Sequence, residues 1–164
     1  MKLLLENWKS YLAEIGDAKG KSYRLSGPSG ALTSTYKFRT SSGTKYEVLF
    51  MKFEYPERTT YDLSFFSVDT DDEESYDLTK ENEPLKIMRT VVRATEDFIQ
   101  RMSEEEFPLT ISFDGTLKTG ETKDTASART RLYKQYVKKI LGDDVTMRIG
   151  DTPNDVEFVV EEKP

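Results

Sequence analysis

The sequence predicts an α+β (mixed α/β) domain, because stretches with strand periodicity and stretches with helical periodicity both occur along its 164 residues. Three alternating segments come early, a long amphipathic segment follows, and a strand, a second helix and two more strands complete the chain. This length suffices for one domain with a substantial core. We expect an antiparallel meander followed by helix–strand–helix and a C-terminal hairpin, with a short helix at the N-terminus.

The meander is predicted over residues 32–68. Its first strand, 32–39, alternates Tyr36 and Phe38 with polar residues, and a Ser-Ser-Gly turn follows. The second strand, 45–54, has apolar residues on both faces, which indicates a central position in the sheet. The chain turns after this strand and returns as the third, 60–68.

The clearest helical signal follows residue 83. Asn82 can cap this helix and Pro84 suits its first turn, where a missing N–H costs nothing. One apolar face is formed by residues at three- and four-residue spacing: Met88, Val91, Val92, Thr95, Phe98, Ile99 and Met102.

The second half of the chain predicts one strand, one helix and a hairpin. Residues 109–113 alternate as a strand, and 125–141 form a helix that ends before Gly142. Residues 145–149 and 156–160 then alternate as the two strands of the hairpin. The helix is expected to bury Leu132, Tyr136, Val137 and Ile140.

The N-terminus divides into a helix and a linker. Residues 1–15 form an amphipathic helix with Leu4, Trp8, Leu12 and Ile15 on one stripe. Residues 16–30 are polar and glycine-rich, as is typical of a flexible linker, so the domain itself is expected at 31–164. The helix either docks on the domain or acts as a detachable tag.

Composition excludes several function classes. The chain has no cysteine and no histidine, which removes disulfides, thiolate metal sites and Ser-His-Asp catalysis. A net charge of −6 argues against non-specific binding of nucleic acid, and a protein is the expected partner. No apolar run could span a membrane, and Glu6 interrupts the Leu3–Leu5 run, so no secretory signal is expected.

An acidic segment covers residues 69–83, with eight carboxylates and one lysine. A solvated loop is its simplest interpretation, and Asp71, Asp72, Glu73 and Glu74 are candidates for contact with a basic partner. Oxygen ligands for calcium are plentiful, but the spacing lacks the glycine and the final glutamate of an EF-hand loop. No metal site is therefore assigned.

The second helix of the domain is basic. It carries Arg129, Arg131, Lys134, Lys138 and Lys139, of which Arg131, Lys134 and Lys138 share one face by spacing. This pattern indicates a solvated outer face, or a surface that docks on an acidic partner or on the phosphates of DNA.

The order of elements resembles the GNAT acyltransferase fold over residues 31–164. The resemblance implies acetyl-CoA as cofactor, in a cleft between 60–68 and 109–113, and Leu132-Tyr133 matches the pair whose tyrosine serves as general acid. The base would then be a carboxylate such as Asp62 or Asp69. However, the family's Gly-rich phosphate loop has no counterpart, because residues 68–84 contain neither glycine nor arginine.

The first 14 residues resemble the capsid-targeting propeptides of T-even-type tailed phages, through Met1-Lys2, Trp8, Tyr11 and Leu12-Ala13-Glu14. This resemblance implies an internal head protein that is cleaved after Glu14. A looser similarity to small tailed-phage proteins rests on Thr90, Val91, Val92, Ile111, Phe113, Ser127, Arg129, Leu132 and Tyr133. The expected location is the host cytoplasm or the virion interior.

Three functions follow as hypotheses. The first is a phage accessory protein that acts as a non-catalytic binding module on a GNAT-like fold, without a cofactor. The second is an acetyl-CoA-dependent N-acyltransferase with a diverged phosphate loop, in which Tyr133 is catalytic. The third is an acidic decoy that occupies a basic site on a host protein through residues 69–83.

Overall fold

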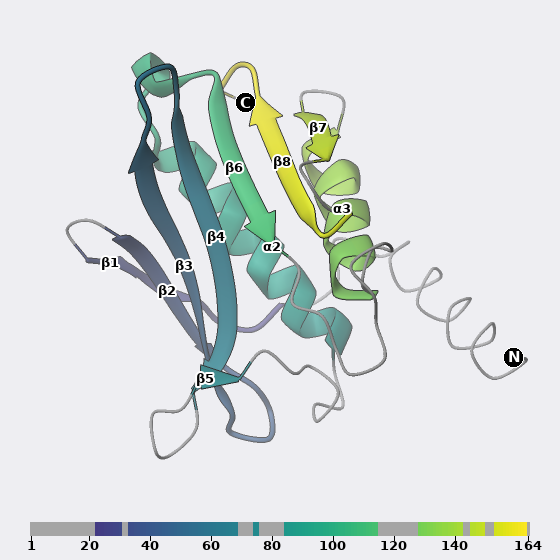
Figure 1. The fold of residues 1–164 in the computed structure, drawn as a ribbon. Helices are drawn as coiled ribbons and strands as arrows, with labels where there is room; N and C mark the ends of the chain where they lie inside the picture. Colours follow the sequence, from purple (N-terminus) through teal and green to yellow (C-terminus); the bar gives the residue numbers. More distant parts are fainter. Residues whose placement is uncertain are drawn as a thin grey trace, which may run out of the picture.

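The computed structural model describes residues 22–30, 33–68, 74–75, 84–114, 128–142, 145–149 and 153–163. Within these ranges a mixed, mostly antiparallel open sheet of seven strands combines with two α-helices (Figure 1). The class predicted from the sequence, α+β, is confirmed.

The seven strands follow the order β1-β2-β3-β4-β6-β8-β7, and the short β5 pairs with the end of β4. Among the strands that the structure describes, only β4 and β6 pair in parallel. The strands are β1 (Ser26–Ser29), β2 (Thr33–Arg39), β3 (Lys45–Glu54), β4 (Thr59–Val68), β5 (Glu74–Ser75), β6 (Leu109–Asp114), β7 (Val145–Ile149) and β8 (Asp155–Val160).

Helix α2 (Pro84–Arg101) lies in the chain between the parallel strands β4 and β6, where a crossover connection is needed. A short 3-10 helix, Glu104–Glu106, leads from α2 towards β6. Helix α3 (Ala128–Leu141) precedes the C-terminal hairpin of β7 and β8. No helix in the described ranges is long and apolar enough to cross a membrane.

The core lies between the two helices and one face of the sheet. On α2, the ring of Phe98 stacks on Phe50 of β3, with 4.2 Å between the ring centroids, and meets Tyr61 of β4 edge-on at 5.0 Å. On α3, Tyr133 packs against Phe113 of β6 and Phe158 of β8. Both helices therefore cover the same face, as α2 behind the central strands illustrates (Figure 1).

The opposite face, which we call the outer face, carries the alternate residues of each strand. On β2 and β3 the core side chains Tyr36, Phe38 and Phe50 alternate with exposed Lys37, Arg39 and Met51. Among the described elements, no helix lies on this face.

The predicted meander is confirmed: strands β2, β3 and β4 begin and end within one residue of their expected bounds. The central position predicted for β3 is also confirmed, since it pairs with β2 on one side and β4 on the other. The long helix and the C-terminal hairpin are confirmed as well, and α3 lies inside the predicted 125–141.

The end of the predicted linker differs from expectation. Tyr23 is buried, its backbone N–H donates to the hydroxyl of Thr90 at 2.9 Å, and its ring stacks on Phe38. Residues 26–29 form β1, which pairs with β2. The cause is Gly27, whose φ of +109° lets the chain approach β2 closely, so glycine here serves sheet pairing instead of flexibility. The predicted helix over 1–15 lies outside the described residues.

Candidate functional site

A cavity of about 540 Å³ lies at the end of the sheet where β2 turns into β3 and β4 ends. Four cationic residues line it, and we call it the cationic cavity: Arg24 precedes β1, Lys37 and Arg39 lie on β2, and Lys45 begins β3. One carboxylate, Glu47, also lines it. The cavity thus has a local charge of +3 in a chain whose net charge is −6.

Strand register explains how these side chains meet. Arg39 of β2 is directly opposite Lys45 of β3, and Lys45 is opposite Val68 of β4. In the neighbouring row Lys37 is opposite Glu47. Because alternate residues of a strand share a face, both rows lie on the outer face while Phe38 and Tyr46 point to the core.

The cations of the cavity differ in their partners. The ammonium of Lys37 lies 3.3 Å from a carboxylate oxygen of Glu47. The side chains of Arg24, Arg39 and Lys45 make no hydrogen bond or ion pair with any residue that the structure describes. Like charges placed directly across a strand pair destabilise a sheet, so the pairing of Arg39 with Lys45 does not serve stability.

Stacked aromatic rings pack beneath the cavity. The rings of Phe38 and Tyr46 stack with 5.2 Å between centroids, and Tyr23 stacks on the other side of Phe38 at 5.7 Å. Leu25 and Val68, both half-buried, add apolar surface beside the cations. The cationic groups therefore extend from a well-packed wall, which favours a preformed binding site.

A second polar cluster joins β2 to α2. The hydroxyl of Tyr36 donates to a carboxylate oxygen of Asp97 at 2.8 Å, and the Nε of Arg101 donates to the same oxygen at 2.6 Å. Burial acts to raise the pKa of Asp97, but the hydrogen bonds from Arg101 and Tyr36 outweigh it and hold this pKa below its usual range. Burial and the neighbouring carboxylate raise the pKa of Tyr36. At neutral pH the cluster is therefore a fixed structural link instead of an acid–base pair.

Tyr133, the predicted general acid, lies in the core. Its side chain is fully buried, with its ring centroid 4.5 Å from that of Phe113 and 5.3 Å from that of Phe158. Its hydroxyl lies 3.3 Å from the hydroxyl of Thr95, and burial raises its pKa. In this position the phenol contacts α2 and the sheet, whereas a general acid must contact a substrate.

Asp62, one of the two carboxylates considered as a base, accepts a hydrogen bond from the hydroxyl of Ser112. Its neighbours Tyr61 and Leu63 both point into the core, so Asp62 lies on the outer face. Tyr133 lies on the helix side, and the sheet separates the two groups. The structure therefore does not bring this acid and this base together.

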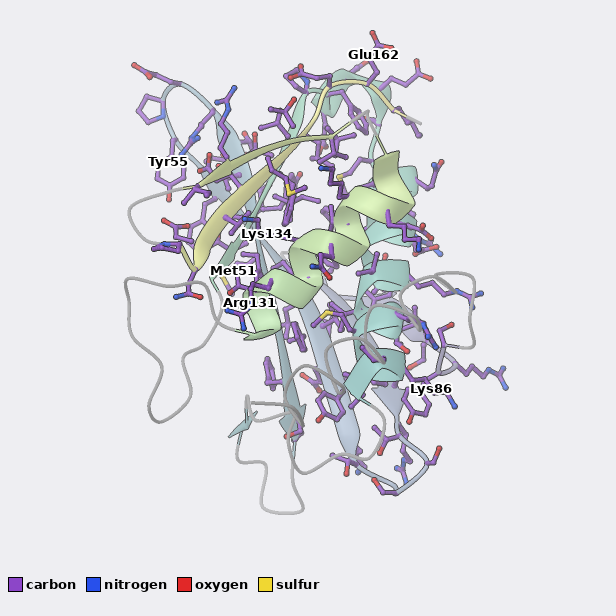
Figure 2. The ribbon with its side chains drawn as sticks, turned by 90° about the vertical axis from the view of Figure 1, so that its right-hand side faces the viewer. Met51, Tyr55, Lys86, Arg131, Lys134 and Glu162 are labelled. Carbon is purple, nitrogen blue, oxygen red and sulfur yellow. The ribbon has the colours of Figure 1, made fainter. Side chains whose placement is uncertain are left out.

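The predicted basic face of α3 is partly exposed. Arg131 and Lys138 are exposed and Lys134 is half-buried, and Figure 2 shows Arg131 and Lys134 on the same side of the helix. This side of α3 is separate from the cationic cavity, whose lining comes from β1 to β4 and the residues just before β1.

Several predicted sites fall outside the described residues: Glu14, Asp69, Asp71, Asp72 and Glu73. The backbone of Glu74 begins β5 and pairs with Val68, next to the cationic cavity. Over the described ranges, no three carboxylates cluster in a way that could hold a metal ion.

The cationic cavity was not predicted from the sequence, although the signal is present. A hairpin that turns at residues 41–43 places Arg39 opposite Lys45, and Lys37 shares their face. Arg24 could not be placed, because β1 was not predicted. Comparisons with protein-family models, curated proteins and solved structures find no match to this chain.

Proposed function

We propose that this protein is a non-catalytic binding module on a GNAT-like fold. The observation that carries the proposal is the position of β5. Strands β4 and β6 pair only over Thr60–Leu63, and beyond this stretch Ser67 and Val68 of β4 pair with β5. The resemblance to the acyltransferases would put the acyl-CoA cleft along this part of β4, where β5 is paired instead.

The fold part of the proposal rests on connectivity. The parallel pair β4–β6 brackets the long helix α2, and the C-terminal hairpin adds to β6 through β8. This arrangement is what the element order of the acyltransferases implies for the two strands around their long helix.

We propose that the module is non-catalytic because of the positions of Tyr133 and Asp62. The phenol of Tyr133 is fully buried, and Asp62 lies across the sheet from it. An acid and a base that act on one substrate must both reach it within hydrogen-bonding distance, so these two groups cannot share a substrate.

The binding part of the proposal rests on exposed surface. Besides the cationic cavity, the outer face exposes Met51 and Phe53 of β3, at 44% and 38%, and Tyr55 follows at 56% (Figure 2 labels Met51 and Tyr55). Exposed apolar side chains that lie close together mark protein-interaction sites. We propose a protein as the partner, in keeping with the acidic net charge.

The origin in a tailed phage, with packaging in the virion head, stays a proposal from the N-terminal resemblance. It is tested by mixing the full chain with a T-even-type prohead protease and weighing the products. Cleavage after Glu14, absent in Glu14→Ala, supports packaging. An intact chain would exclude it.

The acyltransferase alternative is favoured by one observation, the parallel β4–β6 pair around α2. Isothermal titration of acetyl-CoA into the full chain, with a thermal-shift measurement alongside, separates the two functions. Apart from any binding in the cationic cavity, the proposed module gives no heat and no thermal shift. Micromolar binding followed by acyl transfer that Tyr133→Phe abolishes would overturn it.

Acetyl-CoA carries phosphate groups, so the titration needs a matched variant. Arg39→Ser with Lys45→Ser removes two cations of the cavity and leaves Tyr133 and Asp62 in place. If the double variant no longer binds acetyl-CoA, the binding takes place in the cationic cavity, and the proposal of a non-catalytic module is unaffected. Binding of unchanged strength would put the cofactor elsewhere and count against a non-catalytic module.

A further inference from the structure

We infer that the cationic cavity binds a small organic phosphate, with the phosphate group held by Arg24, Arg39 and Lys45 and the organic part against Leu25 and Val68. This inference goes beyond the proposed function and does not depend on it, because the cavity is lined neither by Tyr133 nor by the β4 residues that pair with β6. Its lining residue on β4 is Val68, which pairs with β5. It concerns a site that no sequence motif indicated.

The cationic cavity has an excess of positive charge that can attract an anion. Screening in physiological salt limits charge interactions at the surface to about 8 Å, so a bound anion responds to nearby groups more than to the net charge. Within the cavity four cations face one carboxylate, and that carboxylate already pairs with Lys37 at 3.3 Å. Three cations therefore remain to neutralise a ligand.

Two of these cations repel each other across the β2–β3 strand pair. Arg39 lies directly opposite Lys45 in the β2–β3 register. Opposed like charges weaken a strand pair, whereas an anion between them removes the repulsion. A multivalent anion is thus the ligand that this pair of side chains fits best.

The hydrogen-bond donors of the cavity fit a phosphate group better than a carboxylate. A phosphate monoester carries close to two negative charges and three acceptor oxygens, and arginine binds it through two parallel hydrogen bonds. Two arginines and a lysine supply such donors here. A single carboxylate would leave most of the cationic charge uncompensated.

The size and lining of the cavity suit a small organic molecule. A cavity of about 540 Å³ falls within the range of small-molecule sites. Its apolar part, Leu25 and Val68, gives an organic group a surface to contact. A nucleic acid strand fits less well, because the cavity itself contains the carboxylate of Glu47 and Asp62 lies farther along the same face of the sheet.

The test is isothermal titration of the full chain with three probes: inorganic phosphate, adenosine monophosphate and succinate, all at about 0.15 M salt. We expect saturable binding of phosphate, tighter binding of adenosine monophosphate and the weakest binding of succinate. Succinate binding as tight as phosphate would overturn the choice of anion. Equal affinity for phosphate and adenosine monophosphate would contradict a contact between the organic part of the ligand and the cavity.

The variants locate the site. Arg39→Ser is expected to raise the Kd for adenosine monophosphate about tenfold, since it removes one charge-assisted contact. The control Arg148→Ser removes the same charge from exposed β7, outside the cavity, and should leave the Kd unchanged. Equal effects of the two variants would show attraction by overall charge and overturn the site.

A second variant keeps the result clear if Arg39→Ser folds poorly. Lys45→Ser changes the next strand of the same row and is expected to weaken binding by a similar factor. Circular dichroism of each variant establishes that it is folded. Folded variants of both kinds that bind as tightly as the unchanged chain would exclude the cavity as the binding site.

Discussion

At the scale of single residues, the burial of Tyr133 favours a structural role over that of a general acid. The Leu-Tyr pair in its helix fits both a core position and a general acid, and the sequence cannot separate them. The structure places the ring among Phe113, Phe158 and Thr95. Because Thr95 already donates to the carbonyl of Val91 at 3.0 Å, the Tyr133 hydroxyl is the donor in their shared hydrogen bond.

We predict that Tyr133→Phe lowers the free energy of unfolding by about 1 kcal/mol, the net value of one buried hydrogen bond. Tyr133→Ala also leaves a cavity and should cost about 3–5 kcal/mol. Urea denaturation measures both. A Tyr133→Phe variant of unchanged stability would contradict the hydrogen bond described for this residue, and a small effect of Tyr133→Ala would contradict its packing.

Asp97 gives a prediction about pH. Burial acts to raise its pKa, but the hydrogen bonds from Arg101 and Tyr36 lower it below the unfolded value of about 3.9. A carboxylate of this kind stabilises the fold above its unfolded pKa, and that contribution is lost as pH falls through the folded pKa.

The difference in unfolding free energy between the unchanged chain and Asp97→Asn should therefore be largest near neutral pH and shrink below about pH 4. Urea denaturation at several pH values measures it. Arg101→Gln, which removes the strongest of the favourable hydrogen bonds to Asp97, should reduce the pH dependence. A difference that stays constant down to pH 3 would rule out the lowered pKa.

At the scale of elements, the β2–β3 hairpin joins stability and binding. Its core face carries the stacked rings of Phe38 and Tyr46, and its outer face carries two rows of charge. In one row Lys37 opposes Glu47, and in the next Arg39 opposes Lys45. The first pairing stabilises the hairpin and the second does not.

We predict that Arg39→Glu stabilises the protein by roughly 0.2–1 kcal/mol, because it converts a repulsive cross-strand pair into an attractive one. Lys37→Glu is the matched control: it places two carboxylates opposite each other and should destabilise by a similar amount. Thermal or urea denaturation measures both effects. Destabilisation by Arg39→Glu would mean that Arg39 has a structural partner.

Strand β1 depends on Gly27. A Cβ atom there would lie 2.5 Å from the carbonyl oxygen of Thr35 and 3.3 Å from the Cα of Tyr36. The matched position is Gly43, which has a φ of +91° but no atom within 4 Å of a Cβ. Both glycines have a positive φ, but a Cβ atom would meet other atoms only at Gly27.

Gly27→Ala should therefore destabilise by about 1–3 kcal/mol more than Gly43→Ala, since the clash adds to the backbone strain that both variants share. It should also weaken anion binding, because Arg24 and Leu25 lie next to β1. Denaturation and titration test the two effects. Equal stability of the two variants would argue against the close approach of β1 to β2.

The sequence predicted the elements well where periodicity is strong. Alternation set the bounds of β2, β3 and β4, and the apolar stripe of α2 predicted its burial. The segment before β2 was harder, because glycine and proline there are typical of a linker and equally of a close strand pairing. Sites were harder still: the cationic cavity combines residues from four segments, and only pairing register brings them together.

At the scale of the whole molecule, the two helices and the core lie on one face of the sheet, and the exposed cations of β2 and β3 lie on the other. From its burial we infer a structural role for Tyr133, and we propose the outer face with its cationic cavity as the functional surface. Ligands are then expected to bind at this end of the sheet and not beside Tyr133.

The most direct test is a ¹H–¹⁵N correlation spectrum of the full chain during titration with adenosine monophosphate. Binding in the cationic cavity predicts saturable shifts of the amides of Arg24, residues 37–39 and residues 45–47, with no change near Thr95 and Tyr133. Shifts that gather around Tyr133 and the β4–β6 pair would contradict it and support an acyltransferase-like cleft instead.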